Sequence, residues 1–156
     1  MTEILFEKGD STFEKFIIGL QQFKAARLMV DVPCFSHCSI KVNNLVWQTH
    51  PAKGVTREVY KGGLSDTRQA IKLELTDIQE KNLIDAMNSQ LSINKHDKKG
   101  AVLSGIMMVT GLWLGKKNRE LRNCQTFVAY SLFKIGLWGG NWYKTDILDL
   151  YLKLNT

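Results

Sequence analysis

Cys124 is the residue of this sequence that is best placed for nucleophilic chemistry. It opens the segment "NCQTFVAYSLFKIG" (123–136), in which Asn123 is a good helix N-cap and Gly136 a good C-terminal stop. The unpaired N–H groups and the dipole at the start of a helix favour an anion, so they lower the pKa of a thiol there and can stabilise an oxyanion. The segment therefore predicts a reactive thiol, with a small buried cysteine on a packed helix as the alternative.

A base for this thiol is found in the alternating stretch "SHCSIKVNNLVWQTH" (36–50). Asn43-Asn44 suits a two-residue hairpin turn, and counting outward from it places His37 opposite His50. One face of the hairpin then carries His37, Ser39, Gln48 and His50, and the other carries Ile40, Val42, Leu45 and Trp47. Because a nucleophilic cysteine needs a base and a third group that orients the imidazole, we expect His37 as the base and Gln48 as the third group. His50 is the rival for the third role, and an ordinary sheet histidine is the alternative to a base.

The rest of the chain supplies the elements that must position these groups. A short strand near residue 4 leads into a helix that Ser11 or Asp10 caps, with Phe16, Ile17 and Leu20 on its buried face. The stretch "GVTREVYKGG" (54–63) predicts a further strand.

Four more helices are expected after these strands, one of them in the apolar stretch from Gly100 to Gly115. Thr76 and Gln79 form a capping box that starts one of them, and its predicted buried residues are Ile78, Leu83, Ile84, Met87 and Leu91. The helix that Cys124 opens has a predicted buried stripe of Phe127, Val128, Leu132 and Phe133. Thr145 or Asp146 begins a short terminal helix. The order of helices and strands predicts an α+β fold, with a small antiparallel sheet packed against helices.

Length and composition predict one domain, residues 1–156, because the 156 residues are 44% hydrophobic and 23% charged. A net charge of +6 suits an anionic partner such as nucleic acid, a membrane surface or a cell-wall polymer, and a mildly basic surface is the alternative. The basic residues are scattered in short runs that specify no partner, and we expect no nucleic acid. The apolar stretch from Gly100 to Gly115 is too short to cross a bilayer and predicts a buried helix, with membrane contact less favoured.

The cysteines and the first residues of the chain bear on its location. Cys34, Cys38 and Cys124 lack the spacing of a zinc site, so we expect no metal and free thiols in a reducing compartment. The first residues show no basic segment followed by an apolar stretch, so a signal peptide is not expected and the cytoplasm is the expected location.

These segments, taken in order, resemble the circularly permuted NlpC-type, papain-like cysteine hydrolases, often called the YiiX-like family. The histidine strand "SHCSIKV" is similar to the family's "SHVGIYLG", and "VWQT" is similar to its "VIEA" or "VHA". The following "GV" is similar to "GGV", and the late "NCQTFVAYSL" is similar to "FCSELVAYAL". Lecithin retinol acyltransferase-like proteins share this order of histidine before cysteine, whereas papain and the unpermuted NlpC-type enzymes put the cysteine first. The resemblance spans most of the chain.

The resemblance implies a thiol hydrolase or acyl-transfer enzyme with a circularly permuted papain-like fold and no metal or organic cofactor. Cys124 matches the nucleophile, His37 the base and Gln48 the third polar position, where the family commonly has Glu or His. Since Gln48 is uncharged, it can orient the imidazole but stabilises the imidazolium less than a carboxylate would. "NCQ" replaces the usual "CS" pair, and a hairpin turn one residue shorter keeps His50 a candidate for the third role.

Three functions are compatible with this resemblance. The first is a cysteine peptidase or amidase that forms a thioester intermediate, with peptidoglycan-type peptides as the leading substrate class. Because no export signal is expected, such an enzyme fits a phage-borne protein or one delivered by a secretion system. The second is a lipid acyltransferase or thioesterase, for which the stretch 100–115 supplies an apolar acyl site. The third is a non-catalytic binding module that keeps the fold, since Gln48 weakens the third catalytic position.

Overall fold

The computed structural model describes residues 1–62, 67–93, 97–110, 112 and 122–155. Within these residues the chain forms an α+β fold, as expected, with a five-stranded antiparallel sheet of order β4-β3-β2-β1-β5. The strands are β1 (Thr2–Glu7), β2 (His37–Val42), β3 (Leu45–His50), β4 (Gly54–Val59) and β5 (Arg68–Leu73). The helices are α1 (Thr12–Arg27), α2 (Asp77–Asn88), α3 (Lys98–Thr110), α4 (Cys124–Lys134) and α5 (Ile147–Leu154), with a 3₁₀ turn, η1 (Trp142–Lys144).

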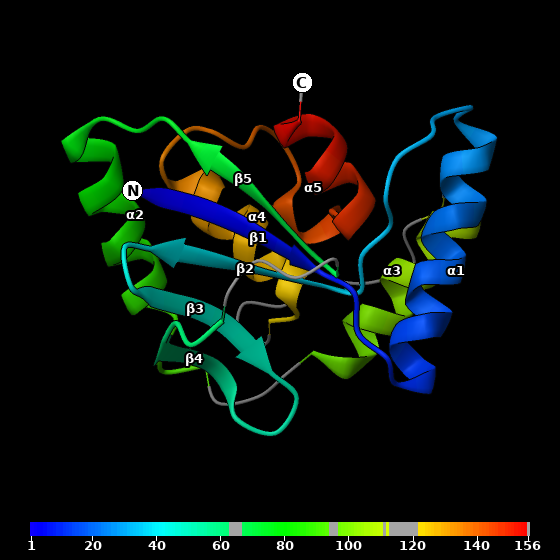
Figure 1. The fold of residues 1–156 in the computed structure, drawn as a ribbon, viewed down its shortest axis with the longest axis horizontal. Coiled ribbons are helices and arrows are strands. Elements are labelled where there is room, and N and C mark those ends of the chain that lie inside the picture. Colours follow the sequence, from blue (N-terminus) through cyan, green and yellow to red (C-terminus); the bar gives the residue numbers. More distant parts are fainter. Residues whose placement is uncertain (63–66, 94–96, 111, 113–121, 156) are drawn as a thin grey trace.

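The helices lie on one face of the sheet and at two opposite sides of it (Figure 1). Figure 1 shows α4 and α5 behind the strands, α2 at one side, and α1 and α3 together at the other. The main core lies between the sheet and α4, where Ile40 and Trp47 of the hairpin pack with Phe127, Val128 and Leu132. Burial of these apolar side chains fixes α4 on the sheet, and so fixes the position of its first residue, Cys124.

Local capping signals place the helix ends as predicted. Ser11, Thr76 and Asn123 each cap a helix through a hydrogen bond from the backbone N–H three residues later. Asp146 caps α5 in the same way, accepting from Asp149 N at 2.9 Å. Gly136, just beyond α4, has a φ of 78°, which suits its predicted role as the stop.

The β2–β3 hairpin has the predicted turn and register. Asn43 adopts a φ of 53°, and Val42 pairs with Leu45 and Ile40 with Trp47 across the turn. The pairing of β2 with β3 ends at Ile40–Trp47, so the expected opposition of His37 and His50 is wrong. Beyond that point the two strands no longer pair with each other, and Cys38 of β2 contacts Cys124, the first residue of α4.

Three predicted core residues are instead exposed: Phe16 (58%), Ile78 (73%) and Phe133 (43%). The buried stripe of α1 is narrow, because the helix stands beside the sheet rather than over its face (Figure 1). Phe16 lies beside this stripe and therefore remains in solvent. Ile78 is the second residue of α2 and Phe133 the last but one of α4, so both lie at helix ends.

The apolar stretch from Gly100 to Gly115 is not the buried helix that we expected. Its helical part belongs to α3, which packs against α1 and exposes Val102, Ile106 and Val109, whereas Met108 is buried. Residues 111 and 113–115 of the stretch lie outside the described residues. Among the helices that the structure describes, none has the length and apolar character needed to cross a membrane.

Candidate active site

A cleft of about 440 Å³ contains all four residues that the sequence singled out, Cys124, His37, Gln48 and His50. Its volume is in the range of ordinary ligand sites. One part of the remaining wall is apolar and comes from helices at the end of the sheet, with Phe13, Ile17, Ala101, Met108 and Ile147. The charged residues Glu7, Lys8 and Glu14 also line the cleft. Residues of the β2–β3 hairpin and of α4, which are more than 70 positions apart in sequence, thus line one cavity.

Cys124 occupies the first position of α4 and is 7% exposed. The Asn123 side chain caps this helix by accepting a hydrogen bond from Thr126 N at 3.0 Å. Sγ of Cys124 donates to Oε1 of the next residue, Gln125, at 3.2 Å. The sulfur therefore lies at the positive end of a helix dipole, where a thiolate is favoured over a thiol.

The neighbours of Cys124 hold the pKa of its thiol well below the ordinary value. The strongest cause is a hydrogen bond from the Cys38 thiol, and a hydrogen bond and charge from His37 act in the same direction. Burial opposes them, because it disfavours the charged form, but it does not cancel their effect.

His37 begins β2 and is half-buried, with Nε2 3.3 Å from Oε1 of Gln48. Burial lowers the pKa of the imidazole, but interactions with Cys124, Glu7 and Gln48 outweigh it, and the net shift is upward. A lowered thiol pKa beside a raised imidazole pKa favours a thiolate–imidazolium pair.

Gln48 and His50, the rivals for the third position, lie differently in the cleft. Gln48 is central in β3, and its side-chain oxygen is within hydrogen-bond distance of His37. His50 is the last residue of β3, and its Nδ1 accepts a hydrogen bond from Ala52 N at 3.2 Å. Both line the cleft, but Gln48 is the one that contacts the imidazole.

Cys38 is a neighbour of Cys124 that the sequence did not indicate as part of the site. It is fully buried, and burial raises the pKa of its thiol well above the ordinary value. Its backbone N–H also bonds to Cys124, at the place where β2 is no longer paired with β3. Strand alternation could have predicted this position. Cys38 follows His37, so its side chain points to the opposite face of the sheet, which is the apolar face that α4 covers.

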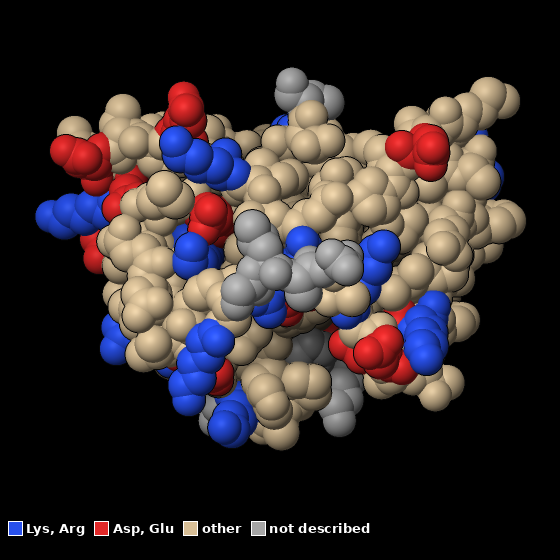
Figure 2. All heavy atoms as spheres, in the orientation of Figure 1, with Lys and Arg blue, Asp and Glu red and all other residues tan. Residues whose placement is uncertain are grey.

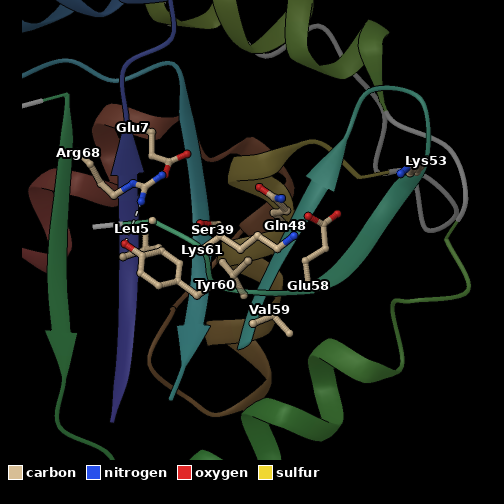
Figure 3. A pocket seen from close by; sticks show the side chains of 12 residues that line it. Leu5, Glu7, Ser39, Gln48, Lys53, Glu58, Val59, Tyr60, Lys61 and Arg68 are labelled. Carbon is tan, nitrogen blue, oxygen red and sulfur yellow. Dashed lines mark hydrogen bonds and ion pairs between the residues drawn. The ribbon is translucent and has the colours of Figure 1, made fainter. Parts of the chain in front are cut away.

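A second hollow, of about 780 Å³, lies on the face of the sheet opposite α4, and Figure 3 shows its lining. Gln48 and Glu7 line both this hollow and the cleft. The Lys61 side chain extends toward Gln48 and Glu58 (Figure 3), and Arg68 pairs with Glu7. Figure 2 shows basic and acidic side chains interspersed over this side of the molecule, so the net positive charge does not form a single patch there.

No protein-family model matches the chain, and a search of curated proteins finds no match.

Proposed function

We propose that the protein is a cysteine hydrolase in which Cys124 is the nucleophile and His37 the general base. The meeting of these two side chains in one cleft carries the proposal, because they are 87 residues apart in the sequence. The directions of their pKa shifts, down for the thiol and up for the imidazole, are those that a reactive pair needs.

The contacts of His37 suggest how the reaction proceeds. Because Nε2 faces Gln48, Nδ1 is the ring nitrogen left to take the thiol proton. The Cys124 thiolate forms a C–S bond to the substrate carbonyl carbon, and the carbonyl electron pair moves onto oxygen. When this intermediate collapses, the C–N bond breaks and His37 gives its proton to the leaving amine. Water then attacks the thioester, His37 removes its proton, and the acid leaves as the thiol returns.

A circularly permuted papain-like fold of the NlpC type is part of this proposal. The resemblance of the histidine strand and the cysteine helix supports it, as does the packing of α4 against β2 in an α+β fold. In this assignment Gln48 orients the imidazole as an uncharged third residue, which suits its contact with Nε2.

The leading substrate class is an amide within a peptide, with peptidoglycan-type peptides first. A lipid or other acyl ester is the second candidate, and the apolar wall of the cleft favours it. Phe13 and Ile17 of α1 and Met108 of α3 line that wall, and apolar side chains of this kind suit a hydrocarbon chain.

Alkylation by iodoacetamide as a function of pH tests the nucleophile and the base. We expect the labelling of Cys124, followed on its own peptide by mass spectrometry, to have a midpoint below the ordinary thiol pKa of about 8.5. In His37→Ala the midpoint should rise toward that value, because the imidazolium no longer favours the thiolate. A wild-type midpoint at or above about 8.5 would instead support a non-catalytic binding module.

A substrate panel separates the two candidate substrate classes. Peptidoglycan fragments and p-nitrophenyl esters of short and long acyl chains are incubated with the wild type and with Cys124→Ala. Release of new amino groups identifies an amidase, and release of p-nitrophenol that increases with chain length identifies an acyl-ester hydrolase. Activity that persists in Cys124→Ala is not due to this site.

A further inference from the structure

Two side-chain amides flank the proposed nucleophile in sequence, those of Asn123 and Gln125. Both are buried, with 0% and 4% of their surface exposed, and both line the same cleft as Cys124. Gln125 stands where the resembled family usually has a serine. The proposed function uses neither amide, so each needs an explanation.

The carbonyl end of the Gln125 side chain contacts the sulfur directly. Oε1 accepts from Sγ of Cys124 at 3.2 Å, and within the described part of the chain Nε2 makes no hydrogen bond. This arrangement suits a protonated thiol. Once the thiol loses its proton, a carbonyl oxygen facing the sulfur becomes repulsive. Rotation about the last torsion of the side chain, which is soft, exchanges the two ends and brings Nε2–H₂ to the sulfur.

Asn123 offers a second donor whose orientation is already set. Its Oδ1 accepts from Thr126 N at 3.0 Å and from Thr126 Oγ1 at 2.7 Å, so the amide cannot turn without losing the helix cap. Its Nδ2 is buried and has no hydrogen-bond partner among the described residues. An unpartnered buried donor is rare in native proteins and suggests a group that is bound during function.

We propose that the amides of Gln125 and Asn123, together with the N–H of Cys124, form the oxyanion site for the carbonyl that Cys124 attacks. This inference rests on the proposed function. When the C–S bond forms, the carbonyl π electrons move to the oxygen, which is then held two bonds from Sγ. If Nε2 of Gln125 takes the place of Oε1 beside Sγ, it lies within reach of the carbonyl oxygen of the substrate. The negative charge that develops on this oxygen then strengthens its hydrogen bond with Nε2–H₂. When the leaving group departs, the C=O bond re-forms and the donors are released.

Two reagents distinguish oxyanion binding from thiol reactivity. p-Nitrophenyl acetate acylates the sulfur through an oxyanion and releases p-nitrophenol, whereas iodoacetamide alkylates it by displacing iodide and forms no oxyanion. Both rates are measured by stopped flow on the pH-independent plateau, where Cys124 is fully ionised. The ratio of acylation to alkylation then reports the oxyanion site alone.

We expect Gln125→Met, which keeps the size of the side chain but removes the donor, to lower this ratio by about 10²- to 10³-fold. Asn123→Ser keeps a capping oxygen and should lower the ratio by at least about tenfold. Gln90→Met is the matched control, since Gln90 is a buried amide outside the cleft, bonded to Ser131 and Arg122. It should lower Tm without changing the ratio.

The possible failures are distinguishable. A ratio unchanged in both Gln125→Met and Asn123→Ser, with a wild type that is readily acylated, would overturn the oxyanion assignment and leave the proposed function standing. A wild type that iodoacetamide alkylates but that p-nitrophenyl acetate never acylates would overturn the proposed function and this assignment with it.

Discussion

At the scale of single residues, the state of the Cys124 thiol depends on what surrounds one sulfur atom. Burial favours the neutral thiol, whereas hydrogen bonds from Cys38 and His37 favour the thiolate. A buried thiolate is costly without such donors, because it exchanges water for hydrocarbon. The site therefore needs several donors at once, and the chain supplies them from β2 and from the start of α4.

Cys38→Val tests the strongest of these contributions. The change removes the thiol hydrogen bond but retains the backbone N–H and the packing against α4, so the pKa of Cys124 should rise. The midpoint of iodoacetamide labelling, and with it the lower-pH limb of any activity profile, should move to higher pH. A midpoint identical to that of the wild type would show that Cys38 only fills space.

His37 governs the other limb of the same profile. Its raised pKa means that the imidazolium persists to higher pH than in a free histidine, and turnover is expected between the lowered pKa of Cys124 and the raised pKa of His37. Because the two groups interact, the two limbs describe the pair rather than either residue.

At the scale of elements, the β2–β3 hairpin decides which side chain of β3 can touch His37. The left-handed Asn43 closes a two-residue turn, and the pairing that starts there ends at Ile40–Trp47. His37 lies beyond the last paired residue, so contact with β3 depends on the reach of the side chains rather than on cross-strand opposition. The side chain of Gln48 reaches the His37 ring, whereas the ring of His50 accepts a hydrogen bond from Ala52 in the turn that follows β3.

This geometry predicts the ranking of two variants. Gln48→Ala should reduce kcat by about tenfold or more, because the imidazole loses the group that orients it. His50→Ala should leave kcat close to the wild-type value. The comparison uses the best substrate from the panel above. If His50→Ala proves the more damaging change, the third role passes to His50.

At the scale of the whole molecule, α1 carries part of the cleft wall and must be fixed to the rest of the domain. Lys24 makes that link, with Nζ 2.6 Å from Asp146 Oδ2 and 2.5 Å from Asp149 Oδ1, at the start of α5. Asp146 is fully buried, and burial together with the charge of Asp149 raises its pKa to about 6 despite the lysine. Its protonation therefore occurs in an accessible pH range.

Lys24→Met should destabilise the fold in a pH-dependent way. At pH 8 the change leaves the Asp146 carboxylate buried without its cation, which costs about 3–5 kcal/mol of unfolding free energy. The cost should be smaller at pH 5, because a carboxyl with a pKa of about 6 is then largely protonated and needs no cation. The native state binds the Asp146 proton more tightly than the unfolded chain does, because the pKa of this carboxyl is raised on folding. The contribution of Asp146 to native stability therefore falls as the pH rises through the range between its unfolded and folded pKa values.

Urea unfolding of the wild type and Lys24→Met at pH 5 and pH 8 measures this difference. Lys15→Met, on the exposed side of α1, is the control and should change stability little at either pH. A loss in Lys24→Met that is equal at both pH values would show that the lysine stabilises the fold through packing of its stem rather than through its charge.

Features that depend on neighbouring residues were determined by the sequence. The caps at Ser11, Thr76 and Asn123, the stop at Gly136 and the turn at Asn43 involve contacts within a few positions, so residue type was enough to predict them. β5 was not predicted. It is an edge strand with exposed polar residues, and its partner strand β1 lies more than 60 positions away in the sequence.

The sequence by itself identified Cys124 and His37 as groups able to do chemistry, because a helix start and an alternating strand are local patterns. Only the tertiary structure decided that they share a cleft, that Gln48 reaches the imidazole, and that Cys38 and Gln125 bond to the sulfur. The physical reason is that burial of the apolar face of α4 against the hairpin sets the position of its first turn. The pattern of a single segment does not show how far Cys124 lies from the side chains of the hairpin.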